Sequence, residues 1–249
     1  MRPPTRSNAI RLVGFDADDT LWRSEDYYRD AQREFEAIIA RYADLEDVHA
    51  RLYAVEKRNL ALFGYGAKGM TLSMLEAAIE ITDARVSAAD LQRIVAIGKS
   101  LLTHPVALLP GIGETLASLA DSHALVLITK GDLHHQRAKV EASGLRDYFA
   151  RVEVFCEKDA PSYARLLATM GVAPDAFVMV GNSLRSDIAP VLALGGWGVH
   201  LPYHVTWAHE AEADVALDAP RLRQATAVHE IPALVRGLGA DRARGSRVR

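Results

Sequence analysis

Short apolar runs recur along the chain, and each gives way at once to polar residues. There are four clear runs and one weaker one, at residues 10–15, 124–128, 151–155, 176–180 and 198–201. Runs of this length, rich in Val, Ile, Leu and Phe, are typical of strands buried on both faces. Segments of helical length lie between or beside them, at residues 113–121, 132–143, 162–170 and 186–193. The alternation predicts an α/β domain with a doubly wound parallel sheet.

Residues 24–103 depart from this pattern, because they contain no clear strand. They indicate four amphipathic helices instead, at residues 26–42, 45–62, 71–81 and 88–102. A glycine-rich break, FGYGAKG at residues 63–69, divides this segment in the middle. An all-helical insertion of this length predicts a separate cap domain. We therefore expect an α/β core of residues 1–22 and 105–249 and a helical cap of residues 23–104.

The composition is that of an ordinary globular protein and excludes several other classes. The chain has 249 residues, of which 49% are hydrophobic and 24% charged, and its formal net charge is −3. Its single cysteine excludes an internal disulfide framework and a multi-cysteine zinc site, and is typical of a reducing compartment. No stretch reaches the roughly 18–20 apolar residues that a membrane-spanning helix needs. We expect a cytoplasmic protein with no membrane partner.

The distribution of charge gives no strong case for nucleic acid as a partner, because the chain as a whole is nearly neutral. The last 14 residues carry five arginines and one aspartate, a local charge of +4. This segment lacks apolar periodicity, and we expect a mobile tail after a last helix at about residues 230–238. The sequence leaves the oligomeric state open, with a homodimer among the options.

Polar side chains follow the predicted strands in four places. Asp16 and Asp18 come after the first strand, Thr129 after the second, Lys158 after the third and Asp187 after the fourth. Because the carboxyl ends of parallel strands meet at one edge of a sheet, we expect these groups to lie together. Carboxylates so close to one another need a cation to ionise fully. Their hard oxygen atoms suit Mg²⁺, and the hydroxyl and the lysine could hold a phosphate beside it.

The order of these motifs resembles that of the haloacid dehalogenase-like hydrolase superfamily. The resemblance rests on Asp16-x-Asp18, Thr129, Lys158 and the glycine-led segment from Gly181 to Asp187, and it spans nearly the whole chain. The helical insertion after the first motif is similar to the helical (C1-type) cap of that family. The resemblance implies a Rossmann-like core with an inserted all-helical cap.

The resemblance also implies a role for each motif residue. Asp16 would be the nucleophile that forms an aspartyl-phosphate, and Asp18 would protonate the leaving oxygen and then activate water. Thr129 and Lys158 would orient the phosphate and stabilise charge in the transition state. Mg²⁺ would bind Asp16, the backbone carbonyl of Asp18, and Asp187. The implied activity is Mg²⁺-dependent hydrolysis of a small phosphorylated metabolite.

Two positions sharpen this interpretation. Asn182 stands where the family often has an acidic residue after the glycine, and its amide oxygen could still ligate Mg²⁺ or order a metal-bound water without adding charge. Asp18 is a residue that dehalogenases of the superfamily lack, since a halide leaves without a proton. Its presence favours hydrolysis of a phosphate ester, and Asn182 has a supporting role at the metal.

Two lysines are further candidates for substrate contacts. Lys130 directly follows Thr129, and Lys68 lies in the glycine-rich break, where it could reach a leaving group. The alternatives are an exposed lysine at the start of a helix and a plain helix–helix connection.

Other functions stay open beside the phosphatase. A phosphomutase-type phosphoryl transferase would use the same residues. Asn182 is the feature that points to a catalytically impaired binding protein on this fold. The sequence does not identify the substrate.

Overall fold

The computed structural model describes residues 10–43, 47–205, 210 and 215–245. The chain forms two compact units. The first comprises Met1–Arg23, Ala107–Thr129 and Ser143–Arg249, and the second comprises Ser24–Val106 and Lys130–Ala142. Residues 130–142, which were expected in the α/β core, belong to the helical unit in the structure.

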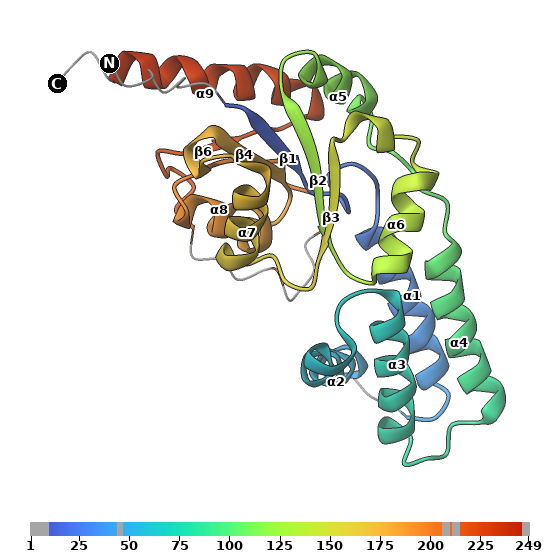
Figure 1. Ribbon diagram of the computed structural model, residues 1–249. Coiled ribbons are helices and arrows are strands. Elements are labelled where there is room, and N and C mark those ends of the chain that lie inside the picture. The colour runs from blue at the N-terminus through green and yellow to red at the C-terminus, as the bar shows by residue number, and fades with distance from the viewer. Residues whose placement is uncertain (1–9, 44–46, 206–209, 211–214, 246–249) are drawn as a thin grey trace. The chain divides into compact units, whose positions relative to one another are not determined.

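The first unit contains a six-stranded sheet in the order β3-β2-β1-β4-β5-β6 (Figure 1). Its strands are β1 (Leu12–Phe15), β2 (Ala124–Lys130), β3 (Arg151–Phe155), β4 (Phe177–Gly181), β5 (Trp197–His200) and β6 (Leu222–Gln224). β1 pairs in parallel with β2 and β4, and β5 pairs in parallel with β4 and β6. The predicted parallel α/β fold is therefore confirmed. The short, polar β6 (Leu-Arg-Gln) gave no apolar signal that could have revealed it.

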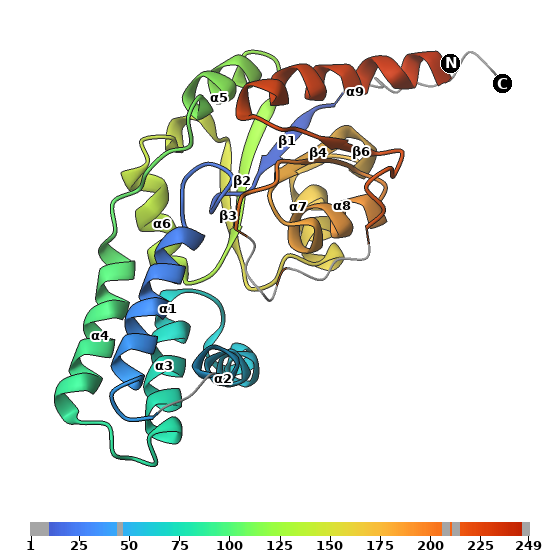
Figure 2. The same cartoon turned by 180° about the vertical axis from the view of Figure 1, so that it is seen from behind.

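Both faces of this sheet are buried. Successive side chains of a strand point to opposite faces. Leu12 packs in one apolar cluster with Tyr163 and Val191, whereas its neighbour Val13 faces the other way and is also fully buried. Figures 1 and 2 show the helices α7 (Ala160–Met170) and α8 (Ala189–Ala193) side by side near the sheet. The helices α5 (Ile112–Ala120) and α9 (Ile231–Gly245) pack against each other as a second pair. Burial on both faces explains why the strand sequences are almost continuously apolar.

The helices of the first unit follow the predicted alternation. They are α5 (Ile112–Ala120), α7 (Ala160–Met170), a π-helical turn (Leu184–Ile188), α8 (Ala189–Ala193), α9 (Ile231–Gly245) and the 3₁₀ turns Arg146–Tyr148, Pro174–Ala176 and Val228–Glu230. None of the helices in the described part of the chain is long and apolar enough to cross a membrane.

The C-terminal helix is longer than the sequence predicts. We expected it to end near residue 238, but α9 continues to Gly245. Ile231, Val235 and Leu238 are buried and anchor its first half. Alanine and arginine, which are good helix formers, extend it despite two glycines. The expected mobile tail is therefore wrong up to residue 245, and residues 246–249 lie outside the described residues.

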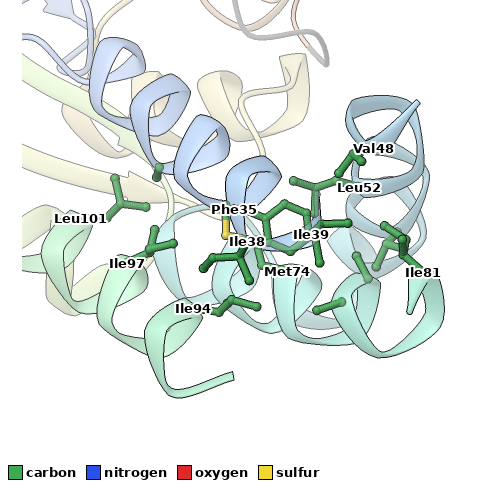
Figure 3. Close-up of a cluster of buried hydrophobic side chains, with 14 of the residues drawn as sticks. Phe35, Ile38, Ile39, Val48, Leu52, Met74, Ile81, Ile94, Ile97 and Leu101 are labelled. Atoms are coloured by element: carbon green, nitrogen blue, oxygen red, sulfur yellow. The ribbon is translucent and has the colours of Figure 1, made fainter. Parts of the chain in front are cut away.

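The second unit is all helical. It contains α1 (Glu25–Ile39), α2 (Val48–Phe63), α3 (Ala67–Ile81), α4 (Ala88–Thr103) and α6 (Leu133–Ala142). Its core is a cluster that includes Phe35, Ile39, Leu52, Met74 and Ile94 (Figure 3). The four predicted cap helices are present, although the expected start of the second, at residue 45, lies outside the described residues.

The glycine-rich break between α2 and α3 is shorter than predicted. Only Gly64, Tyr65 and Gly66 lie outside the helices, and Ala67 already begins α3. Gly64 and Gly66 have φ values of 69° and 105°, which residues with a Cβ rarely adopt. The break is therefore a tight turn, and Lys68 lies in the first turn of α3 and not in a loop.

Candidate active site

The predicted functional residues of the first unit lie where the strands end. Asp16 directly follows β1, and its backbone N–H donates to the carbonyl of Val180 on β4 at 2.9 Å. Thr129 is the second-last residue of β2, which is the other neighbour of β1 in the sheet. Its exposed fraction is 1%. The order β2-β1-β4 therefore sets three of the four predicted motifs side by side at one sheet edge.

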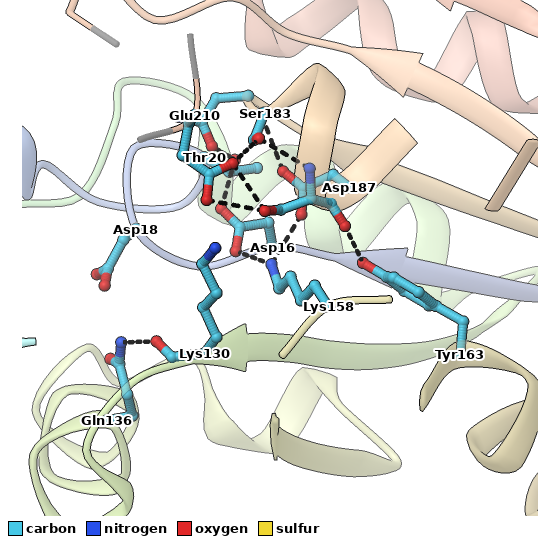
Figure 4. A network of polar contacts seen from close by, with 12 residues as sticks. Asp16, Asp18, Thr20, Lys130, Gln136, Lys158, Tyr163, Ser183, Asp187 and Glu210 are labelled. Carbon is cyan, nitrogen blue, oxygen red and sulfur yellow. Dashed lines mark hydrogen bonds and ion pairs between the residues drawn. The ribbon is translucent and has the colours of Figure 1, made fainter. Parts of the chain in front are cut away.

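Lys158 joins two of the predicted acids into one buried cluster (Figure 4). Its ammonium group donates to Asp16 Oδ1 and, at 2.7 Å, to Asp187 Oδ1. The exposed fractions of Lys158, Asp16 and Asp187 are 4%, 6% and 1%. One buried cation therefore serves two buried carboxylates that are far apart in the sequence.

The segment after β4 is shaped around the Asp187 carboxylate. The backbone N–H of Ser183 donates to Asp187 Oδ2 at 3.0 Å. A Cβ at Gly181 would lie 2.2 Å from the same oxygen, so no other residue fits this position without displacing the acid. Ser183 caps the π-helical turn by accepting from the backbone N–H of Ser186. This turn brings Asp187 back over the end of its own strand.

Thr20 links the first motif to Asn182. Its hydroxyl lies 3.1 Å from Asp16 Oδ2 and 3.3 Å from Asn182 Oδ1. The amide oxygen of Asn182 is thus close to the Asp16 carboxylate. Thr20 was not predicted as a site residue, because a threonine in a turn is also common for structural reasons alone.

The electrostatics of the cluster differ from those of a simple ion pair. Burial raises the pKa of Asp16 to about 7, with the negative charges of Asp187 and Asp18 adding to the increase, although Lys158 opposes it. Burial alone would lower the pKa of Lys158, but its two carboxylate partners hold that pKa well above the ordinary value. Lys158 is therefore charged, and a single lysine does not satisfy the acids around it.

The oxygen atoms at this edge fit a magnesium ion. Asp16 and Asp187 could supply carboxylates and Asn182 an amide oxygen, and the family resemblance adds the backbone carbonyl of Asp18; all of these are hard donors. The described residues contain no group of three His, Cys, Asp or Glu side chains arranged for a metal. Burial and the neighbouring carboxylates raise the pKa of Asp16, and a divalent cation bound beside it would favour its ionised form.

Asp18 lies apart from the Lys158 cluster. Figure 4 shows the Asp18 carboxylate directed away from Asp16, whereas Lys158 lies between the carboxylates of Asp16 and Asp187. The indole N–H of Trp22 donates to Asp18 Oδ1 at 2.7 Å. The three predicted acids of the site are therefore in two different environments.

Sequence reasoning missed several residues that support the site. Glu210 accepts hydrogen bonds from the hydroxyls of Ser183 and Ser186, the latter at 2.7 and 2.8 Å. The Tyr163 hydroxyl donates to the Ser186 carbonyl at 3.1 Å, and His200 Nε2 lies 3.0 Å from the Asn182 carbonyl. These contacts join segments that are distant in sequence, so no local pattern could reveal them.

The two lysines proposed for substrate contacts lie in the second unit. Lys68 forms an ion pair with Asp132 at 2.9 Å, and the Lys130 ammonium lies 4.2 Å from the centre of the Tyr65 ring. The turn between α2 and α3 is thereby joined to the segment that precedes α6. Both contacts link residues 130–142 to the rest of the helical unit.

Known proteins resemble this chain in sequence and in structure. The family model described as haloacid dehalogenase-like hydrolase matches residues 10–195. An N-acylneuraminate-9-phosphatase from Rattus norvegicus is 32% identical over 129 residues, which cover 49% of this chain and 50% of that protein. The Homo sapiens protein of the same name is 35% identical over 102 residues, which cover 39% of this chain and 41% of that protein. The chain therefore spans about half the length, or less, of these curated relatives.

A solved structure extends the likeness to almost the whole chain. A haloacid dehalogenase-like family hydrolase from Xanthomonas campestris is 54% identical and has a TM-score of 0.86. The match covers 95% of this chain and 99% of that one. The motif order, the parallel sheet and these matches agree, and the chain belongs to the haloacid dehalogenase-like hydrolases.

Proposed function

We propose that the protein is a Mg²⁺-dependent phosphatase that hydrolyses a small phosphate monoester through an aspartyl-phosphate. The observation that carries this proposal is the buried Asp16–Lys158–Asp187 cluster, with Asp18 two residues beyond Asp16 and hydrogen-bonded to the indole of Trp22. The relatives named as phosphatases support the same reaction class. Asp18 supports a phosphate ester over a halide as the substrate, because an alkoxide leaving group needs a proton.

The first step transfers the phosphoryl group to the protein. A carboxylate oxygen of Asp16 attacks phosphorus, and the bond from phosphorus to the ester oxygen breaks. Asp18 gives its proton to that oxygen, so an alcohol leaves. In the second step Asp18 takes a proton from water, which attacks the same phosphorus. Inorganic phosphate leaves and the Asp16 carboxylate is restored.

Charge stabilisation falls to residues around the nucleophile. Lys158 would neutralise the phosphoryl oxygens as charge develops, and Thr129 would hold one of them through its hydroxyl. Asp16, Asp187, Asn182 and the Asp18 carbonyl would hold Mg²⁺. When bound, the ion supplies a second positive charge at the phosphoryl group.

The metal assignment is tested by binding rather than by turnover. Mg²⁺ should raise the unfolding temperature of the wild-type protein, because a ligand at 100 times its Kd stabilises by about 2.7 kcal/mol. Asp187→Asn should remove most of this increase and Asn182→Ala a smaller part. Asp30→Asn, an exposed substitution in α1, is the control and should keep the full increase. An equal increase in all four proteins would refute the ligand set.

The helical unit would determine which phosphate ester is bound. We propose that Lys68 and Lys130 contact the leaving group, so Lys68→Ala should raise KM for a preferred substrate more than KM for a generic aryl phosphate. The exposed Lys99 on α4 offers a matched control, and Lys99→Ala should leave every KM unchanged. A uniform change of KM across substrates would contradict a leaving-group contact.

The function itself is tested by phosphate release. Purified protein with Mg²⁺ should release phosphate from at least one member of a panel of sugar phosphates, acidic sugar phosphates including N-acylneuraminate 9-phosphate, nucleotides and phosphoglycolate. Chelation of the metal should abolish release. A coupled isomerase assay with sugar phosphates distinguishes a phosphomutase. No release from any member or from a generic aryl phosphate would favour the impaired binding protein.

A further inference from the structure

The turn after β1 brings a tryptophan back to the second aspartate of the first motif. Trp22 is fully buried, and its indole N–H donates to Asp18 Oδ1 at 2.7 Å. The backbone supports the same approach, because Asp18 and Trp22 form a β-bridge and the N–H of Asp19 donates to the Trp22 carbonyl at 2.7 Å. Asp19 has a φ of 63°, which lets the chain turn sharply here.

Trp22 is itself held firmly by the rest of the first unit. It forms a second β-bridge with Leu108, and the neighbouring residues Leu21 and Arg23 are hydrogen-bonded to the same stretch, to Leu109 and Ala107. A side chain bonded to this indole takes its orientation from a fixed point. The contact therefore restricts the rotamer of Asp18.

Another buried tryptophan shows that the fold does not simply pair every indole. Trp197 on β5 is 7% exposed, and its Nε1 has no hydrogen-bond partner among the described residues. A buried indole N–H normally finds an acceptor. Trp197, whose indole lacks such a partner in the described part of the chain, therefore provides a natural comparison for the contact between Trp22 and Asp18.

The contact separates Asp18 from the other acids of the site. Asp16 and Asp187 both pair with the Lys158 ammonium, whereas Asp18 receives a hydrogen bond from a neutral donor. A third carboxylate drawn to the same lysine would be unable to face an ester oxygen.

From this geometry we propose that Trp22 is a positioning residue that orients the Asp18 carboxylate for proton transfer. The inference rests on the proposed function, in which Asp18 acts as acid in the first step and as base in the second. Trp22 touches neither the phosphate nor the metal in this role. Its effect passes entirely through Asp18.

Trp22→Phe removes the donor but keeps an aromatic ring in the buried position. With an alkyl phosphate, whose leaving group needs a proton, we expect kcat to fall about 10- to 100-fold, a part of the roughly 10²- to 10⁴-fold that general acid catalysis contributes, and KM to change little. With p-nitrophenyl phosphate the leaving group needs no proton. The first turnover should then be nearly as fast as in the wild type, and later turnovers should slow about tenfold because water activation still requires Asp18.

The matched control is Trp197→Phe, which should leave both steps unchanged. Equal slowing of the first and later turnovers in Trp22→Phe, or no slowing with either substrate, would overturn the positioning role. Absence of any turnover by the wild-type protein would instead overturn the proposed function, so the two failures are distinguishable.

A spectroscopic measurement covers the case in which Trp22→Phe does not fold. In the ¹⁵N-labelled protein, Asp18→Ala should move the indole N–H resonance of Trp22 upfield, because the acceptor is lost, and leave that of Trp197 in place. A Trp22 resonance that does not move would refute the contact and the positioning role with it.

Discussion

Asp16 in the first unit and Asp90 in the helical unit are both almost fully buried, and their surroundings are opposite. Asp90 accepts hydrogen bonds from Arg41, Tyr42 and Ser87, and these donors hold its pKa well below the ordinary value. Asp16 shares a single lysine with another acid, and burial raises its pKa to about 7. A buried carboxylate with several hydrogen-bond donors stays ionised and stabilises the fold. A buried carboxylate with too few donors to keep it ionised is typical of a site that binds a cation or reacts.

The largest effect that this comparison predicts is on turnover. Asp16→Asn should lower kcat by about 10⁴-fold or more, the order of magnitude seen when a nucleophile or its partner is removed from a hydrolase. Asp90→Asn should leave kcat within about twofold, while both proteins keep the wild-type circular dichroism spectrum. Comparable loss in both variants would mean that the contrast between the two aspartates has no functional content.

The sequence predicted the positions of the motif residues better than it predicted the residues that contact them. Asp16, Thr129, Lys158 and Asp187 follow apolar strands, and a parallel sheet necessarily collects such residues at one edge. Thr20 and Glu210, in contrast, enter the site through turns and a long connection. Their positions depend on contacts with Asn182 and Ser186 that have no local pattern in the sequence.

The fold shows the same division. The long apolar strands and the amphipathic helices were predictable from their periodicity, because burial of those residues determines both the pattern and the structure. β6 has only three residues, two of them polar, and follows a backbone pairing that a hydrophobic pattern does not record. The continuation of α9 past residue 238 reflects helix propensity in a segment where charge suggested disorder.

The next largest effect concerns the cations that pair with the two aspartates, Lys158 beside Asp16 and Arg41 beside Asp90. Lys158→Ala would leave Asp16 and Asp187 buried without a partner, and loss of one member of a buried ion pair costs about 3–5 kcal/mol. Arg41→Ala should cost much less, because the arginine side chain is about half exposed (49%) and Tyr42 and Ser87 still donate to Asp90. Urea denaturation of the metal-free proteins measures both free energies of unfolding. An equal cost for the two substitutions would contradict the difference in burial.

The two aspartates should also give pH dependences of opposite sign in the metal-free protein. The folded state raises the pKa of Asp16 from 3.8 to about 7, so it binds a proton that the unfolded state has lost, and its contribution to stability falls as pH rises from about 4 to 7. The lowered pKa of Asp90 gives stability that is present above pH 4 and is lost as pH falls through the folded-state pKa.

The measurement is the free energy of unfolding of the wild-type protein minus that of each variant, across pH, with chelator present. The difference from Asp16→Asn should decline with rising pH, by at most about 1.4 kcal/mol per pH unit. The difference from Asp90→Asn should decline with falling pH. Two curves of the same sign would show that one of the assigned environments is wrong.

The smallest predicted effect compares two serines that cap helical turns, one in each unit. Ser87 accepts from the backbone N–H of Asp90 at 3.1 Å, and Ser87→Ala should cost about 1 kcal/mol without a change in activity. The Ser183 hydroxyl makes the equivalent contact with Ser186 at 3.0 Å, but it also donates to Glu210 and so holds the turn that carries Asp187. Ser183→Ala should therefore weaken Mg²⁺ binding as well as stability. Calorimetric titration with Mg²⁺ distinguishes the two variants. Identical Mg²⁺ affinities of Ser87→Ala and Ser183→Ala would refute a role of Ser183 in holding Asp187.

The membership of residues 130–142 in the helical unit determines how the protein can be dissected. The backbone N–H of Arg23 donates to the carbonyl of Ala107 at 3.0 Å, so the ends left by excision of residues 24–106 already lie side by side and could be spliced. The shortened chain would nevertheless retain α6 without Tyr65 and Lys68, which contact the segment before it. The helical insertion is therefore not removable as a separate module, because α6, which follows it in the sequence, belongs to the same compact unit.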